Sequence, residues 1–356
     1  MRQHALNTWQ KFRKNKLALS GLVFIVVLVV VSLTGYLFLP DKTVASNNMQ
    51  LSLALKKPGF NVKILKLSSD SSSEKEFWLF SGKSQINEEI PIDTFYQLFD
   101  TVYYKPYTAS GNGLWTSIKV DDKIFKANSA IESRTYWLGT DRFGRDQLSR
   151  LLLGTRVSLS VGAIAVIISL IIGVTLGLLG GYFGGWVDTI VMWLINVIWS
   201  LPTLLIVVAM SLALGKGFWQ IFVAVGLSMW VELARMVRGQ VKSVKELEYV
   251  QAARVLGFSH VRIMLRHILP NIMGPVIVIC AANFASAILL EAGLSFLGLG
   301  VQPPMPSWGM MIKEHYSFIV FNAAHLAIFP GLAIMFTVMA FNFIGVGLRD
   351  AFDVRD

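Results

Sequence analysis

Long apolar runs alternate with polar segments along the chain, and this pattern predicts several membrane-spanning helices. A helix needs about 20 mostly apolar residues to cross a bilayer. The first such run covers residues 17–39 and follows a tail with five cations and no acid. Further spans are predicted at 157–179, 186–214, 218–237, 272–290 and 326–348. The expected fold class is therefore an all-α membrane protein with six transmembrane helices.

The distribution of Lys and Arg predicts how these helices are oriented. Short segments rich in Lys and Arg stay on the cytoplasmic side of a membrane. The tail at 1–16 is cationic, and the segment 232–267 holds seven Lys and Arg against three acids. Six spans place both segments, and both termini, in the cytoplasm. The segment 139–156 goes against the rule, because its four arginines would lie outside.

The first apolar run is expected to remain as a membrane anchor. A cationic start followed by an apolar run is also found in signal peptides, but their apolar core has only about 7–15 residues. The run at 17–39 is longer. We therefore expect transmembrane helix 1 here, with its N-terminus in the cytoplasm.

Residues 40–135 are polar and differ from the rest of the chain. The stretch "SSDSSSEKE" at 68–76 predicts a solvated loop, while "FNVKILKL" at 60–67 and "EFWLF" at 76–80 predict strands. We expect an inserted extracytoplasmic domain of α/β or mostly β type between helices 1 and 2, with a loosely ordered loop as the alternative. The chain then divides into a tail (1–16), helix 1 (17–39), this domain (40–135) and a five-helix core (136–356).

Composition supports a membrane protein and argues against a nucleic-acid partner. Hydrophobic residues make up 54% of the chain and charged residues only 15%, whereas soluble domains carry about a quarter charged residues. The net charge of +10 does not indicate nucleic-acid binding, because the cations flank apolar runs instead of forming one basic face. Cys280 is the single cysteine, so no intrachain disulfide is possible.

Motifs that carry chemistry are missing from the sequence. No G-x-x-x-x-G-K-[ST] phosphate loop occurs, so the chain should not bind nucleotide by itself. The five histidines lack metal-ligand spacing, and no serine sits in G-x-S-x-G. We therefore expect no catalytic residue, no metal and no cofactor bound by this chain, and we do not expect an enzyme.

Three polar or helix-breaking residues of the spans are candidates for a role. Pro202 should kink the third span, either for packing or as a bend beside a pathway. Glu291 closes the fifth span and either lines a pathway or is hydrated at the interface, since charges inside a bilayer are costly and often functional. Asp188 opens the third span, and we expect it to be structural.

The segment 248–271 interrupts two apolar spans with a basic, helix-prone sequence. "EYVQAARVL" predicts a short helix with Val250, Ala253 and Leu256 on one side. Gly257 suits the end of this helix and Ser259 the start of a second, which Pro270 should end. Arg262 and Arg266 would share one face. These features fit either a compact knob that meets another protein or a helix on anionic lipid.

The words "EYVQAARVLG" and "RHILPN" resemble the EAA loop of permease subunits in bacterial ABC importers. That loop has an acid, two alanines, a glycine four residues after the second alanine, and a later Leu-Pro. "LGTDRFGRDQLSRLLLGTRVSLSVG" and "LSFLGLGVQPPMPSWGMMI" resemble two further stretches of the dipeptide/oligopeptide/nickel branch, and the likeness is to its C-type permease subunit. It covers residues 137–356 and, more loosely, the first span. Gln251 stands where the family usually has an acid, and Glu248 is the nearby negative charge.

The resemblance implies a fold, a function and partners. It implies the type I ABC importer permease fold in the bacterial inner membrane, a heterodimer with a related B-type permease, two ATPase subunits that hold ATP and Mg, and an extracytoplasmic solute-binding protein. It also implies import of di- or oligopeptides by alternating access, with nickel or another small solute as the alternative and an ATP-independent channel or scaffold as a rival. ATPase coupling falls to the loop at about 239–271, through Glu248, Gln251, Ala252, Ala253, Gly257, Arg262, Arg266, Leu269 and Pro270.

Overall fold

The structure is a computed structural model that describes residues 2–68, 81–83, 87–99, 101–108, 111, 113–119, 131–215 and 217–352. It divides into two compact units. The first unit comprises Met1–Val29, Ser158–Gln302 and Leu332–Asp356. The second comprises Val30–Val157 and Pro303–Gly331. The second unit therefore contains more of the chain than the segment 40–135 of the sequence-based division.

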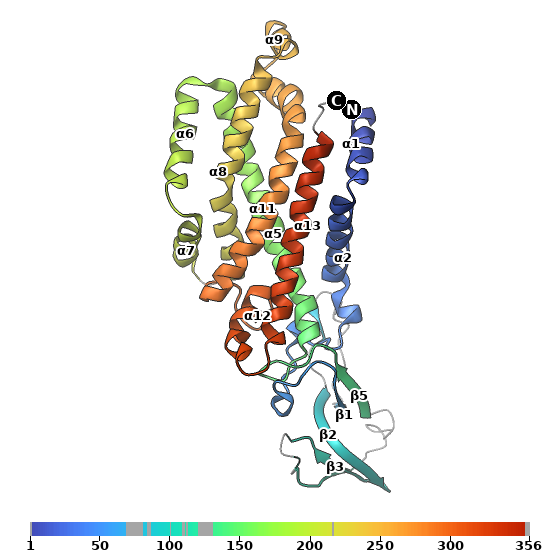
Figure 1. Ribbon diagram of the computed structural model, residues 1–356. Helices are drawn as coiled ribbons and strands as arrows, with labels where there is room; N and C mark the ends of the chain where they lie inside the picture. Colours follow the sequence, from blue (N-terminus) through green and yellow to red (C-terminus); the bar gives the residue numbers. More distant parts are fainter. Residues whose placement is uncertain are drawn as a thin grey trace. The chain divides into compact units, whose positions relative to one another are not determined.

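Five described helices are long and apolar enough to cross a membrane. They are α2 (Lys16–Phe38), α5 (Gln147–Phe183), α8 (Phe218–Lys245), α11 (Leu269–Leu297) with the turns before it, and α13 (His325–Phe352). The pair α6 (Gly185–Trp199) and α7 (Thr203–Leu214) brings the number to six if it counts as one span. Each predicted apolar run thus corresponds to a helix or a helix pair, in a helical membrane-type permease fold (Figure 1).

The third predicted span is broken, not merely kinked. Its halves α6 and α7 are bent by 91° at a gap that contains Pro202. Proline lacks the N–H that would continue α6, and it disfavours the helical conformation of the residue before it. The chain therefore leaves the helix after Trp199 and restarts at Thr203.

The fourth predicted span is longer than the sequence suggested. Residues 238–245 were expected in a cytoplasmic loop, but they continue α8 as far as Lys245. The apolar side of this extension explains the difference, because Val237 and Val241 are both fully buried. Glu232 consequently lies well inside a helix.

Glycines allow close packing of α5 on α8 in the first unit. A Cβ on Gly173, Gly177 or Gly181 would lie 2.7–2.9 Å from backbone carbonyls of α8 or from Val237 and Val241. Small residues four apart let two membrane helices approach closely. The sequence itself shows this G-x-x-x-G-x-x-x-G pattern.

The start of the chain packs on α13 within the first unit. The helix α1 (Arg2–Lys14) leads into α2, and Phe12 and Ala18 are buried together with Ala351. A Cβ on Gly21 would lie 2.8 Å from the Ala340 carbonyl oxygen. The junction of α1 and α2 and the last turn of α13 are therefore neighbours in the first unit (Figure 1).

The second unit contains a five-stranded antiparallel sheet. Its strands are β1 (Phe60–Ser68), β2 (Asn87–Leu98), β3 (Thr101–Pro106), β4 (Thr116–Lys119) and β5 (Ile131–Tyr136), in the order β4-β3-β2-β1-β5. Short 3-10 turns, η1 (Val44–Ser46) and η2 (Leu51–Leu53), precede it. The strand predicted from "FNVKILKL" is confirmed as β1. "EFWLF" at 76–80 and most of "SSDSSSEKE" lie outside the described residues.

An ion pair and apolar side chains hold this sheet together. Leu65, Ile92 and Val102 are buried on neighbouring strands. Arg134 of β5 donates two 2.8 Å hydrogen bonds to the Glu89 carboxylate of β2. Although burial disfavours its charge, hydrogen bonding to Glu89 holds the pKa of Arg134 above its ordinary value.

A buried ionic cluster joins two distant parts of the second unit. The Asp141 carboxylate accepts hydrogen bonds from the backbone N–H groups of Phe143 (2.8 Å) and Arg145 (2.9 Å), and from Arg145 Nε (2.5 Å). Arg145 Nη2 donates to Glu314 Oε2 in α12 (Trp308–His315) at 2.9 Å. Arg150 lies 3.8 Å from Asp141 and 3.7 Å from Glu314. The two stretches that resemble the family outside the EAA loop meet nearby, where Trp308 Nε1 donates to Leu151 O at 3.0 Å.

Candidate functional site

The segment singled out in the sequence forms a corner between α8 and α11. It consists of α9 (Glu248–Val255), α10 (His260–Arg262) and the π-helix η3 (Ile263–Ile268), which leads directly into α11. We call residues 246–271 the α9 corner. It projects beyond the ends of α8 and α11 in Figure 1.

Both predicted caps of the α9 corner are confirmed. Gly257 has a φ of +77°, its N–H donates to Arg254 O (3.0 Å), and the N–H of Phe258 donates to Ala253 O (3.2 Å). This pair of bonds is the Schellman motif that ends many helices. Ser259 then begins the next helix, since its hydroxyl oxygen accepts from the Arg262 N–H (3.4 Å).

Replacing Gly257 by valine should loosen α9 through backbone strain. A Cβ at this position has open space around it, so the penalty comes from the positive φ alone. A left-handed backbone costs a non-glycine residue about 1–2 kcal/mol. Hydrogen exchange of residues 249–260 should therefore become about tenfold faster. Asparagine, which adopts this conformation more readily, should have a smaller effect. Equal exchange in the valine variant and the wild type would contradict this account.

The two alanines of α9 differ in burial. Ala253 is 4% exposed and packs with Val250 inside the protein, whereas the side chain of Ala252 is exposed. Leu256 was expected on the buried side but is 72% exposed, because the helix ends there and the chain turns. Val255 is 88% exposed. The outer face of α9 is therefore formed by Ala252, Val255 and Leu256.

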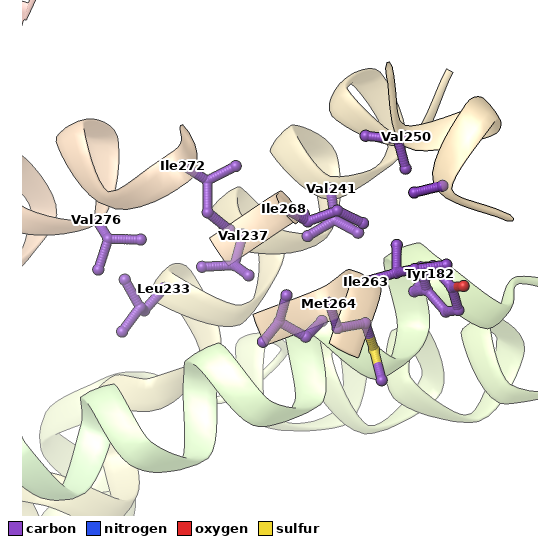
Figure 2. Packing of buried hydrophobic residues seen from close by; sticks show 12 residues of the cluster. Tyr182, Leu233, Val237, Val241, Val250, Ile263, Met264, Ile268, Ile272 and Val276 are labelled. Carbon is purple, nitrogen blue, oxygen red and sulfur yellow. The ribbon is translucent and has the colours of Figure 1, made fainter. Parts of the chain in front are cut away.

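The inner face of α9 belongs to a buried cluster that reaches three long helices. Figure 2 shows the cluster, with Val250 beside Val241, Ile263 and Tyr182. Its buried members come from α5, α8, α9, η3 and α11: Leu178, Tyr182, Leu233, Val237, Val241, Val250, Ala253, Ile263, Met264, Ile268, Ile272 and Val276. The inner face of α9 is therefore packed against all three long helices.

Pro270 does not end a helix, contrary to the sequence-based expectation. The helix that begins at His260 continues through η3 into α11, so Leu269 and Pro270 lie in its course. Proline cannot donate to the carbonyl four residues back. The ladder shifts before it, and Leu269 donates to Met264 O, five residues back. The α9 corner is consequently joined to α11 by continuous helix.

The polar residues of the α9 corner are mostly exposed. Glu248 is exposed in the first turn of α9. The Gln251 amide donates to Glu246 O (3.3 Å) and to Glu246 Oε2 (3.4 Å). Arg262 and Arg266 are both exposed, and the Arg262 guanidinium stacks on Phe258 at 4.4 Å. Gln251 therefore has a local partner that a carboxylate at the same position would repel.

A hydrogen bond joins the α9 corner to α5, and ion pairs join the neighbouring helices α6 and α8. Tyr182 OH of α5 lies 2.9 Å from His260 Nδ1. In the neighbouring helices, Asp188 of α6 pairs with Arg238 and, at 2.7 Å, with Lys242 Nζ, both on α8. The structural role expected for Asp188 is thus supported by its contacts.

Glu291 is not a hydrated interfacial carboxylate, which was one of its two expected roles. It is fully buried in the last third of α11, and its Oε1 accepts a hydrogen bond from Ser295 Oγ at 2.7 Å. Pro202, the other pathway candidate, lies in the break between α6 and α7. The structure does not bring Glu291 or Pro202 to the α9 corner.

One grouping of possible metal ligands lies in the described part of the second unit. Ligand atoms of Asp141, Glu314 and His315 lie within 4.8 Å of one another. Both carboxylates already pair with Arg145, whose positive charge opposes a bound cation. Burial lowers the pKa of His315, and its Nδ1 is already hydrogen-bonded to the Met311 carbonyl oxygen at 2.8 Å. These contacts suit a structural cluster better than a metal centre.

Comparisons with known proteins identify the family. Residues 173–355, just over half of the chain, match the family described as binding-protein-dependent transport system inner membrane component. Residues 6–58 match the N-terminal TM domain of oligopeptide transport permease C.

Individual relatives align over most of their own length. The glutathione transport system permease protein GsiD of Pectobacterium atrosepticum is 45% identical over 223 residues, which are 63% of this chain and 74% of that protein. GsiD of Shigella flexneri serotype 5b is 44% identical over 223 residues, 63% of this chain and 73% of that protein. A chain of the MetNI methionine ABC transporter in inward-facing conformations has a TM-score of 0.47 and 18% identity, covering 57% of this chain and 96% of that chain.

The family match and the helices agree with each other. The matched region 173–355 runs from within α5 to the end of the chain and includes the whole α9 corner. The relatives are permease subunits and not enzymes. The chain belongs to the binding-protein-dependent transport system inner membrane components, as a C-type permease subunit of a bacterial ABC importer.

Proposed function

We propose that the α9 corner receives the movement of a partner ATPase and passes it to the membrane helices. The observation that carries this proposal is the division of α9 into two faces. Ala252, Val255 and Leu256 are exposed, whereas Val250 and Ala253 are buried with α5, α8 and α11. An exposed apolar face on a short, capped helix suits insertion into a groove of another protein. The inner face supplies the mechanical connection.

The proposed cycle is a two-state equilibrium biased by nucleotide and ligand. Two ATPase subunits hold ATP and Mg and draw together when ATP binds. The α9 corner moves with its ATPase, and the buried cluster carries α5, α8 and α11 along. The pathway then opens alternately to the two sides of the membrane. Such a change requires only that nucleotide and ligand bind the two states with different affinity.

The proposed cargo is a di- or oligopeptide. Support comes from the match to oligopeptide transport permease C and from relatives named as glutathione transport permeases, since glutathione is itself a peptide. Nickel or another small solute is the alternative cargo. The proposed assembly contains a related B-type permease, two ATPases and an extracytoplasmic solute-binding protein. Both termini and the α9 corner lie in the cytoplasm, and the β-sheet lies outside.

A second role for the α9 corner is favoured by its exposed cations. Arg254, Arg262 and Arg266 are all exposed, and a basic helix with apolar residues also suits the surface of an anionic membrane. In that case the chain would act as a channel or scaffold without an ATPase. Uptake driven by ATP distinguishes the two roles.

ATP-dependent uptake tests the proposed function. The chain is reconstituted in proteoliposomes with its B-type partner and ATPases, and a radiolabelled tripeptide is supplied with the solute-binding protein. We expect the peptide to accumulate against its gradient with ATP, and not with a non-hydrolysable analogue. Equal, downhill entry in both conditions would contradict the proposal and indicate a channel.

A further inference from the structure

A cavity in the first unit lies beside the broken helix. Its volume is about 340 Å³, at the lower end of the range for small-molecule sites. Polar side chains from three helices line it, next to Trp199 at the end of α6: Thr203 from α7, Ser228 and Glu232 from α8, and Asn283 and Ser286 from α11. The sequence pattern predicted a kink at Pro202, beside this cavity, but pointed to none of the lining residues as candidates for a site.

The break between α6 and α7 opens onto this cavity. Trp199 is the last residue of α6 and Thr203 the first of α7, and both line the cavity. Non-helical backbone inside a membrane is tolerated where it is buried in protein or lines a polar cavity. The position of the break therefore indicates that the cavity accommodates polar groups of a ligand.

The polar residues of the cavity lie near the middle of their helices. Glu232 is 14 and 13 residues from the two ends of α8, and Asn283 is 14 residues from the end of α11 and further still from the start of that continuous helix at His260. At a rise of 1.5 Å per residue this is about 20 Å, so both residues are far from the helix ends. Charged and polar groups within membrane-spanning helices are costly in lipid and commonly mark a path for substrate.

The chemistry of the cavity combines a buried donor with a carboxylate. Asn283 is 3% exposed, and within the described ranges its Nδ2 has no hydrogen-bond partner. Buried donors of this kind are rare unless a ligand or water completes them. Glu232 supplies a negative charge on the same cavity. The nearby cation, Arg235, is stacked on the Trp199 ring at 4.1 Å. The rest of the wall is apolar and includes Met229 and Leu290.

We propose that this cavity binds the amino-terminal end of a short peptide during its passage. Glu232 pairs with the free ammonium group, and Asn283 Nδ2 donates to the first peptide carbonyl. Apolar side chains of the peptide lie against Trp199 and Leu290. The site thereby favours peptides with a free amino group over blocked ones. This inference rests on the proposed function and specifies its cargo.

Cysteine protection in the assembled transporter tests the site directly. The chain carries Cys280→Ala, which removes its own thiol, and Ser286→Cys, which places a reporter on the cavity wall. Labelling by a small thiol reagent is followed with and without trialanine or N-acetyl-trialanine. We expect trialanine to slow labelling and the acetylated peptide to have little effect. Glu232→Gln should weaken the protection about tenfold or more, because a hydrogen bond to a charged group is worth roughly one to two decades of affinity. Asn283→Ala should weaken it about fivefold, because the hydrogen bond it removes joins two neutral groups.

The matched control is Gln240→Ala, which removes an exposed amide of α8 that does not line the cavity. Its protection by trialanine should equal that of the reporter chain. Equal protection by the blocked peptide, or unchanged protection in both cavity variants, would overturn the site. ATP-driven tripeptide uptake is measured in the same proteoliposomes. Normal uptake without any protection refutes the site alone, whereas absent uptake in the wild type refutes the proposed function.

Discussion

Replacing Arg145 by methionine is expected to lower the free energy of unfolding by about 3–5 kcal/mol. The guanidinium is 2% exposed and binds Asp141 at 2.5 Å, Asn47 Oδ1 at 3.1 Å and Glu314 at 2.9 Å. Methionine fills a similar volume but leaves two buried carboxylates. Arg150 would remain as the nearest guanidinium among the described residues, at 3.8 and 3.7 Å. Removing one partner of a buried ionic cluster costs far more than an exposed pair contributes.

Thermal unfolding of the purified protein in detergent measures this loss. The matched control is Arg142→Met, three residues earlier. Arg142 is exposed and stacks on Phe143 at 4.5 Å, so its replacement should cost only about 0.5–1 kcal/mol. Hydrogen exchange should locate the loss of the Arg145 variant in residues 139–150 and α12. Similar unfolding of the two variants would show that the buried cluster does not stabilise the second unit.

The same cluster shows what the sequence could not predict. Arg145 and Glu314 are separated by 169 residues, and no periodic pattern connects them. The four arginines of 139–156 were weighed only as charges that oppose the positive-inside rule. Two of them, Arg145 and Arg150, are buried and paired in the second unit, so they are not free cations of a loop. The positive-inside rule counts exposed charges, so it carries less weight for the orientation of residues 139–156.

Local features of the α9 corner were predicted well because local forces determine them. The caps at Gly257 and Ser259 depend on backbone conformation and on hydrogen bonds within a few residues. The long spans depend on apolar composition, which the sequence displays directly. The end at Pro270 was predicted wrongly, because a π-helix absorbs the missing N–H and lets the helix continue. Burial of Glu291 could not be predicted, since it depends on tertiary packing.

The Gln251 departure from the family pattern has a local physical explanation. Its amide donates to the backbone and carboxylate of Glu246 at the end of α8. A glutamate at position 251 would place two carboxylates side by side, which costs energy even near water. Gln251 therefore stabilises the junction of α8 and α9, and Glu248 remains the exposed acid of the first turn.

Replacing Ala252 by tryptophan is expected to reduce ATP-driven uptake about 30-fold or more, which is the effect of losing a binding hot spot of about 2 kcal/mol. The side chain of Ala252 is exposed, so the larger residue should not disturb the fold. It would instead hold the outer face of α9 away from the proposed ATPase groove. Uptake of a radiolabelled tripeptide is compared with the amount of transporter in the membrane, which should not change.

The neighbouring alanine provides the matched control for this variant. Ala253→Trp puts the same side chain into the buried cluster, where Ala253 contacts the helices around it and is 4% exposed. Overpacking of this kind costs about 1–3 kcal/mol, so the Ala253 variant should lose thermal stability as well as uptake. The Ala252 variant should keep its unfolding temperature, because only its contact with a partner is changed. Normal uptake by the Ala252 variant would contradict coupling through this face, and a loss of stability equal to that of Ala253→Trp would show that the two faces are not distinct.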